Sequence, residues 1–395
     1  IIKKFYKKNK TIILMIKSKI YKEQKIIKVI DTPLSSFLLE KILEGESNFN
    51  EIIEIKKDQK ENKIKAKNIL KISKKKLFLK NKFIITNSLS FFWTRSKILN
   101  FLKFYKLRTD IFAKIDFKKN HIYIGCKTST IMNVIPKSNR IFIDHGFDDY
   151  KPKAYKLSNL NKIEDMLKEK ITKYIGYPYI SFNEKMKSYT VCKIPKFSKN
   201  FIDMQNLPTN QILKSYFIRI KKKYPKINTI FLLDKNWHTN HHYKKNKELD
   251  YDQINFELIK KYIPKGQKFF IKFHDFAIQS NQVSKFFIKQ MNNLGYHAVD
   301  VDRYFKIPYR GMIPAELFIG KLKLTRVISR YTSALHNISH NTSINCIMDI
   351  NPELHYINYN SKYYNVLLKE FNNRYTFNKS IRGKVNIKSI HEQNI

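Results

Sequence analysis

The feature that most constrains the fold is a repeated alternation of short apolar strands with helical segments. In the first half, five runs rich in β-branched and aromatic residues predict strands at 26–30, 52–55, 82–86, 121–125 and 140–143. Helical spacing of apolar residues predicts helices at 36–44, 91–104 and 128–134. Asp31, Thr32 and Pro33 suit the N-terminus of the first helix. Strands that alternate with helices favour a parallel α/β sheet.

The same alternation restarts at residue 229. Strands are predicted at 229–233, 269–273, 298–300 and 326–329, and helices at 210–224, 254–262, 283–293, 315–319 and 332–337. The stretch 195–208 holds two prolines and few periodic apolar positions, so it is the expected boundary between two domains. The pattern predicts two Rossmann-like α/β domains facing a central cleft.

Four regions follow from this division. We expect a basic N-terminal extension at 1–25, an N-terminal domain at 26–200, a C-terminal domain at 209–365 and a basic C-terminal tail at 366–395. Met15 is a plausible start residue within the extension. Neither half contains a G-x-G-x-x-G or a G-x-x-x-x-G-K-[ST] motif, which argues against an NAD enzyme and a P-loop ATPase.

The charge of the chain is strongly positive, with 77 Lys and Arg against 32 Asp and Glu, a net +45. Such a charge suits nucleic acid, but Lys rises together with Ile and Asn along the whole chain instead of gathering in one patch. We therefore interpret it as composition bias with a general attraction to anionic partners, including anionic lipid headgroups. Nucleic acid is the less favoured partner.

The cysteines and the apolar runs bear on the compartment. Cys126, Cys192 and Cys346 are odd in number and widely spaced, which excludes a disulfide framework and fits a reducing cytoplasm. They also lack the paired spacing of a zinc site. No apolar run approaches the roughly 18 residues that span a bilayer. We expect a cytoplasmic protein.

Two polar motifs follow predicted strands directly. Asp144, His145 and Gly146 come after the strand 140–143, where Asp144 is either a general base or the cap of the next segment. His274 comes after the strand 269–273, where it either donates to a phosphate or is a structural residue. Ligands of open α/β sheets bind at the carboxyl ends of strands, which makes both positions candidates.

A third motif combines a carboxylate with hydroxyls. Glu316 opens a predicted helix, and Ser329, Thr332 and Ser333 follow the next strand. Hydroxyls and backbone N–H groups at a helix N-terminus form a phosphate cradle, and a carboxylate nearby can hold ribose hydroxyls. Ordinary N-capping by Thr332 or Ser333 is the open alternative.

The order of these motifs resembles that of the bacterial sialyltransferases and capsule polysialyltransferases. Those families carry D/E-D/E-G, HP and S/T-S motifs on a two-domain GT-B scaffold, and residues 29–36 (VIDTPLSS) also look like their first strand and loop. The resemblance spans residues 26–350. Two positions depart from the family pattern, because His145 replaces a second acid and Asp275 replaces the proline after the histidine.

The resemblance implies an inverting, metal-independent transfer of sialic acid or a related sugar from a CMP-linked donor, CMP-sialic acid, to a glycan or glycolipid acceptor. Such a reaction serves capsule or lipooligosaccharide biosynthesis and needs no cofactor. The cysteines and the positive charge lead us to expect a cytoplasmic enzyme that can contact the anionic inner face of the membrane peripherally.

The resemblance also implies roles for single residues. Asp144 is the expected base, with His145 in reserve, and His274 assists the leaving phosphate. The nucleotide sugar is expected on Glu316, Ser329, Thr332 and Ser333, and the acceptor or cleft loops on Thr32, Asn87, Ser88 and Gly146. Two alternatives remain open: a teichoic-acid-type CDP-alcohol phosphotransferase, and a basic nucleic-acid-binding protein without catalysis.

Overall fold

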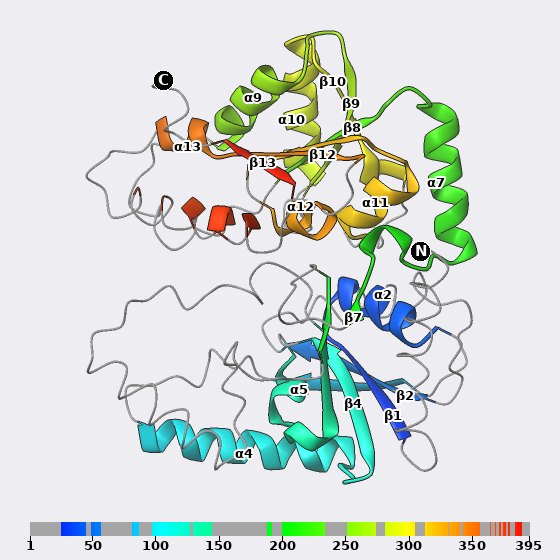
Figure 1. Cartoon of the computed structure of the whole chain (residues 1–395), viewed down its shortest axis with the longest axis vertical. Coiled ribbons are helices and arrows are strands. Elements are labelled where there is room, and N and C mark those ends of the chain that lie inside the picture. Colours follow the sequence, from blue (N-terminus) through cyan, green and yellow to red (C-terminus); the bar gives the residue numbers. More distant parts are fainter. Residues whose placement is uncertain are drawn as a thin grey trace.

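The computed structural model contains two parallel β-sheets, one in each half of the chain (Figure 1). It describes residues 25–44, 49–56, 81–86, 97–126, 129–143, 188–191, 200–233, 251–273, 281–304, 313–330, 332–339, 343–355, 364, 368, 371–372, 374–376, 378–379 and 384–388. Helices lie between the strands along the chain, so the predicted α/β class with two parallel sheets is confirmed.

The first sheet has seven strands in the order β3-β2-β1-β4-β5-β6-β7. All neighbours pair in parallel. The strands are β1 (Lys25–Ile30), β2 (Phe49–Lys56), β3 (Asn81–Thr86), β4 (His121–Cys126), β5 (Arg140–Ile143), β6 (Ser188–Thr190) and β7 (Asn200–Phe201). The order reverses between β1 and β4, which makes their carboxyl ends the topological switch point where such sheets bind ligands.

The helices of the first half are α2 (Pro33–Ile42), α4 (Lys97–Ile115) and α5 (Thr130–Val134), and the 3-10 helix η3 is Lys137–Asn139. The predicted cap of α2 is confirmed: Thr32 accepts from the backbone N–H of Ser35, Ser35 accepts from that of Thr32, and a proline occupies the first turn. Helix α4 runs eleven residues past its predicted end because Leu107, Ile111 and Ile115 continue a buried stripe at a spacing of four.

The second sheet has six parallel strands in the order β10-β9-β8-β11-β12-β13. They are β8 (Thr229–Leu232), β9 (Lys268–Lys272), β10 (His297–Asp300), β11 (Arg326–Ser329), β12 (Asn345–Asp349) and β13 (Val385–Lys388). Counted from its own first strand, the order is 3-2-1-4-5-6, that of the Rossmann fold. The first sheet has the same order with β7 added.

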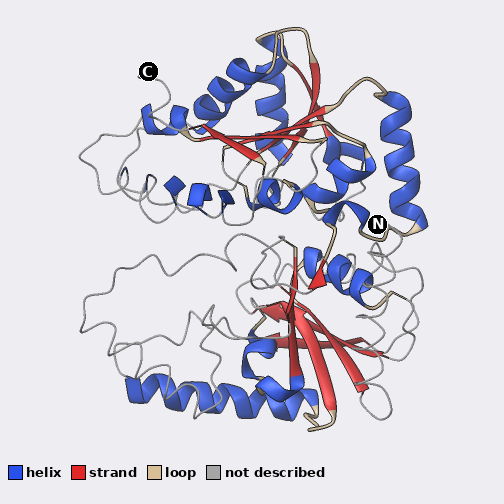
Figure 2. Ribbon diagram, viewed as in Figure 1, coloured by secondary structure: helices blue, strands red, loops and turns tan. Residues whose placement is uncertain are grey.

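The helices of the second half are α7 (Gln211–Lys223), α9 (Tyr251–Tyr262), α10 (Asn281–Asn293), α11 (Ala315–Lys321), α12 (Ser333–Ile338) and α13 (Asn351–His355), with the 3-10 helices η5 (Met204–Asn206) and η7 (Val301–Tyr304). Apolar residues of α9 and α10 share one core cluster with β8, β9 and β11. Those of α7, α11 and α12 share another. Helices therefore cover both faces, which explains why the strands are almost continuously apolar (Figure 2).

The second sheet extends further along the chain than the sequence analysis expected. Residues 366–395 were assigned to a basic tail, but β13 pairs in parallel with β12, and Val385 and Ile387 are buried against the core. Asn378 donates to the backbone oxygen of Val385 at 3.1 Å. The strand escaped prediction because its signal is only two apolar residues in alternation with polar ones.

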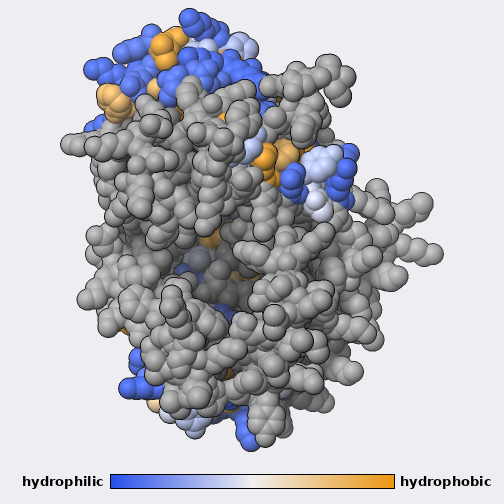
Figure 3. All heavy atoms as spheres, turned by 90° about the vertical axis from the view of Figure 1, so that its left-hand side faces the viewer, coloured by the Kyte–Doolittle hydropathy of each residue, from blue (hydrophilic) through white to orange (hydrophobic). Residues whose placement is uncertain are grey.

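The two halves meet through the segment that follows β7. Ile202, Met204 and Leu207 belong to the same buried cluster as Ile30 of the first sheet and Phe270 of the second. The 3-10 helix η5 packs against α11. The described surface at the top of the molecule, formed by the second half, is mainly hydrophilic, in keeping with the high lysine content (Figure 3).

Candidate functional site

The candidate site lies at the carboxyl ends of the strands around the switch point of the second sheet. Leu232 at the end of β8 pairs with Ser329 of β11 on one side and with Lys272 of β9 on the other. Phe273 follows Lys272 and is buried. His274 comes next in the chain and lies outside the described residues, so its predicted role stays a prediction. His274 follows strand β9 in the chain and Thr332 follows strand β11. The two predicted site residues therefore come after the two strands that flank β8.

Ser329 ties two strand ends together. Its side chain is fully buried, and its Oγ donates to the backbone oxygen of Leu232 at 2.9 Å. Because this bond joins β11 to β8 at the switch point, it fixes the spacing of the strands there. The hydroxyl therefore has a structural partner, and its expected contact with a nucleotide stays a prediction.

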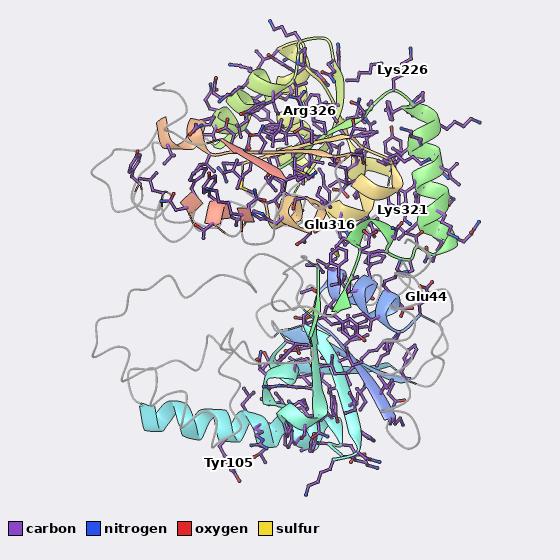
Figure 4. The ribbon with its side chains drawn as sticks, in the orientation of Figure 1. Glu44, Tyr105, Lys226, Glu316, Lys321 and Arg326 are labelled. Atoms are coloured by element: carbon purple, nitrogen blue, oxygen red, sulfur yellow. The ribbon has the colours of Figure 1, made fainter. Side chains whose placement is uncertain are left out.

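Glu316 is a buried carboxylate in the first turn of α11. Its Oε1 accepts from Nδ2 of Asn337, a buried residue of α12, at 2.8 Å. This bond links the two helices that flank β11 in the chain. Figure 4 shows Glu316 on the side of the second half that is nearer to the first half. Asn337 was missed by the sequence analysis, because nothing local relates it to a residue 21 positions away.

Thr332 is the N-cap of α12. Its backbone is extended, and its Oγ1 accepts from the N–H of Ala334 at 3.4 Å. The capping alternative is therefore confirmed for Thr332, while Ser333 forms the first residue of the helix. Arg330, which the sequence analysis did not single out, lies two residues before the cap and is buried. The sequence signal that could have identified Arg330 is an arginine directly after an apolar strand.

The end of β9 carries a buried ion pair. Lys272 Nζ lies 3.2 Å from Asp302 Oδ2, and both side chains are almost inaccessible. The same ammonium lies 5.2 Å from the ring centroid of Phe318 in α11. Oδ1 of Asp300 accepts from the N–H of Asp302, which fixes the turn after β10. These contacts hold the strand end that precedes His274.

The first sheet has a different arrangement at its switch point. Glu54, buried in β2, accepts from Ser129 Oγ at 2.5 Å and from Thr86 Oγ1 at 2.6 Å. It also accepts from the backbone N–H groups of Thr130 and Ile131 at 3.0 and 3.3 Å. Ser129 is the N-cap of α5. The first turn of this helix is thus bound by a carboxylate of the chain itself.

The residues predicted for the first domain have mixed outcomes. Thr32 serves as the cap of α2, as described above. Asp144, His145 and Gly146 lie outside the described residues, as do Asn87 and Ser88. The strands before these two motifs are described: β5 ends at Ile143, directly before Asp144, and β3 ends at Thr86, directly before Asn87. The sequence analysis missed Glu54, whose signal was an acidic residue inside a strand of otherwise buried character.

Three further observations concern metals, membranes and thiols. Within the described ranges, no three His, Cys, Asp or Glu side chains gather in a way that could hold a metal ion. None of the helices described is both long and apolar enough to cross a membrane. Cys126 and Cys346 are buried and not in disulfides, and burial raises the pKa of the Cys346 thiol to about 12.

Comparison with known proteins adds little. No family model matches the chain, and no curated protein matches it either. One similar solved structure is the N-terminal domain of trehalose-6-phosphate phosphatase from Candida albicans, with 9% sequence identity and a TM-score of 0.35. The similarity covers 83% of this chain and 84% of that one. A likeness this low carries no argument about function.

Proposed function

We propose that this chain is a glycosyltransferase of GT-B type that moves sialic acid, or a related sugar, from a CMP-linked donor to a glycan or glycolipid acceptor with inversion. The observation that supports it most is the second switch point. There, the bond between Glu316 and Asn337 joins α11 to α12, whose N-cap is Thr332. The bond fixes Glu316 to the last turn of α12, and the N-cap of that helix follows β11 at the switch point.

The nucleotide belongs to the second half in this proposal. Glu316 binds a ribose hydroxyl, while Thr332, Ser333 and their backbone N–H groups receive the phosphate. His274 adds a donor or a positive charge as negative charge builds on the leaving phosphate. The first half is the less suitable nucleotide site, because Glu54 already places a negative charge at the matching helix start.

The acceptor reacts from the first half. Its hydroxyl oxygen attacks the anomeric carbon of the sugar, the bond from that carbon to the phosphate oxygen breaks, and CMP leaves with the electron pair. Asp144 takes the hydroxyl proton, with His145 as the reserve base. Because the base and the nucleotide belong to different halves, the halves must close around one reacting centre. No metal or cofactor enters these steps.

A panel of nucleotide sugars tests the proposal. The full chain is incubated with CMP-sialic acid, with other nucleotide sugars and with CDP-glycerol, and nucleotide release is followed with and without a chelator. We expect CMP release from CMP-sialic acid in the presence of a glycan acceptor, unaffected by the chelator. Release from CDP-glycerol alone would support the alcohol-phosphate transferase instead. No turnover together with steeply salt-dependent RNA binding would support the nucleic-acid alternative.

Three substitutions separate the assigned roles. Asp144→Asn is expected to lower turnover by about 10²–10⁴-fold with CMP affinity unchanged, because a general base acts in the transition state. His274→Ala is expected to lower turnover and also to weaken CMP binding, because it contacts the phosphate before reaction. If Asp144→Asn stays fully active while His145→Ala is inactive, the base is His145. If all three variants stay active, the assigned chemistry is wrong.

A further inference from the structure

Helix α7 carries an unusual surface. Its sequence, QILKSYFIRIKKK, contains five basic residues and no acidic one. Leu213, Phe217 and Ile220 face the core, as in any amphipathic helix. On the opposite side, however, two isoleucines are exposed: Ile218 at 68% and Ile212 at 48%. In Figure 1 the helix stands at the right-hand edge of the second half, outside the sheet.

The exposed isoleucines lie among positive charges. Residues four apart on a helix share a face, so Lys214 and Lys222 lie on either side of Ile218. Both lysines are exposed, as is Arg219. The face therefore combines a protruding branched aliphatic side chain with a ring of cationic ones. We call the exposed residues of α7 the α7 face.

Positive charge continues beyond both ends of the helix. Figure 4 shows Lys226 near one end of α7 and Lys321 near the other. The pKa of Lys321 is lowered, first by burial and then by the positive charges of Lys214 and Lys41, with Asp203 acting in the opposite direction. Lys214 and Lys41 therefore lie close enough to Lys321 to repel it. Positive charge from three elements, α2, α7 and α11, gathers beside the start of α7.

We propose that the α7 face is a docking surface for an anionic lipid bilayer. Amphipathic helices that lie in a membrane interface combine apolar side chains, which enter the headgroup boundary, with Lys and Arg, which bind anionic headgroups. Nucleic acid would use the same cations, but its phosphate backbone offers nothing to Ile218. The exposed isoleucines therefore favour a lipid surface over a polyanion. This inference does not depend on the proposed enzymatic function.

Vesicle co-sedimentation of the full chain tests the proposal. The vesicles contain phosphatidylglycerol with phosphatidylcholine, or phosphatidylcholine alone, and we expect binding to the first kind only. Ile218→Ser is expected to weaken binding about tenfold, because it removes the aliphatic side chain that enters the headgroup boundary. Lys214→Gln and Lys222→Gln are each expected to weaken it about fivefold. All three positions are exposed, so the thermal unfolding midpoint should not change.

A matched control is available on another helix. Phe286 of α10 is 58% exposed, and Lys285 and Lys289 lie on the same short helix. Phe286→Ser is expected to leave vesicle binding unchanged. The proposal is overturned if Phe286→Ser weakens binding as much as Ile218→Ser, or if none of the α7 variants changes it. It is also overturned if RNA displaces the vesicles and binds with an affinity that the lysine variants lower but Ile218→Ser does not.

Discussion

In both sheets a helix starts after the fourth strand in the same topological place, but the residues around the two helix starts differ. In each, the N-cap of the helix after the fourth strand lies three residues beyond the end of that strand: Ser129 follows Cys126 and Thr332 follows Ser329 at this spacing. The strand order around both positions is the same. Any difference between the two helix starts therefore comes from the residues that surround them.

One difference lies at a matched position, within the second strand of the first sheet and just after the second strand of the other. In the first sheet, the last residue of β1 pairs with Ile53, and Glu54 comes next. In the second sheet, the last residue of β8 pairs with Lys272, and Phe273 comes next. Glu54 binds the start of α5 with its carboxylate, whereas the matching residue in the other half is a buried aromatic ring. A helix start attracts anions, and the first half satisfies this attraction internally. The same topology can therefore carry a carboxylate anchor in one half and an aromatic ring in the other.

The largest effect is expected from removing the internal carboxylate. Glu54→Ala leaves two hydroxyls and two backbone N–H groups without their acceptor in a buried place, and it should lower the free energy of unfolding by at least about 3 kcal/mol. Urea denaturation measures this loss. The control is Glu44→Ala, an exposed glutamate paired with Lys41, for which less than about 0.5 kcal/mol is expected. Equal losses would show that the carboxylate is not a structural anchor.

The next largest effect is expected in CMP binding, and it distinguishes the N-cap Ser129 from the N-cap Thr332. Ser129→Ala and Thr332→Ala should each lower stability, by about 1 kcal/mol for the loss of a cap and somewhat more at Ser129, which also donates to Glu54. Only Thr332→Ala should weaken CMP binding, by about tenfold, because one hydrogen bond to a charged phosphate is lost. Isothermal titration calorimetry of both variants measures this. If Ser129→Ala weakens CMP binding equally, the division between the halves is wrong.

The smallest effect concerns the boundary between the halves. Burial and then Lys214 and Lys41 hold the pKa of Lys321 below 10.5 in the folded chain, so the unfolded chain binds more protons there, and stability should rise with pH until 10.5 is passed. Because the side chain is partly exposed, solvent screening keeps the gain small. Lys321→Met should be slightly more stable than the parent at neutral pH and equal to it above pH 10.5. Parallel unfolding curves across that range would contradict this.

Much of the architecture could be predicted because its signals are local. Runs such as 229–233 and 269–273 are apolar, and turn residues or helical periodicity follow them, so the strand positions and the restart of the alternation followed directly. Strands β7, β12 and β13 were not predicted. Strands β7 and β13 have only two and four residues, and their pairing depends on neighbours already in place.

The candidate site was predictable only in part, for a related reason. Whether a hydroxyl binds a ligand or a neighbour depends on partners distant in sequence: Ser329 donates to a residue 97 positions away, and Ser129 to one 75 positions away. Motif order locates such residues at strand ends but does not reveal these partners. Glu54 had no motif at all, since its role arises only when β2, β3 and α5 come together.

The late position of β13 has a consequence for synthesis on the ribosome. All strands of the first sheet lie before residue 202, so that sheet can pair while the rest of the chain is still being made. The outer edge of β12 stays unpaired until residues 385–388 have emerged. The unpaired edge of an apolar strand can pair with a strand of another chain. Neighbouring nascent chains on one messenger RNA can therefore misassemble through β12 during that interval. Slow translation after residue 349 would lengthen it.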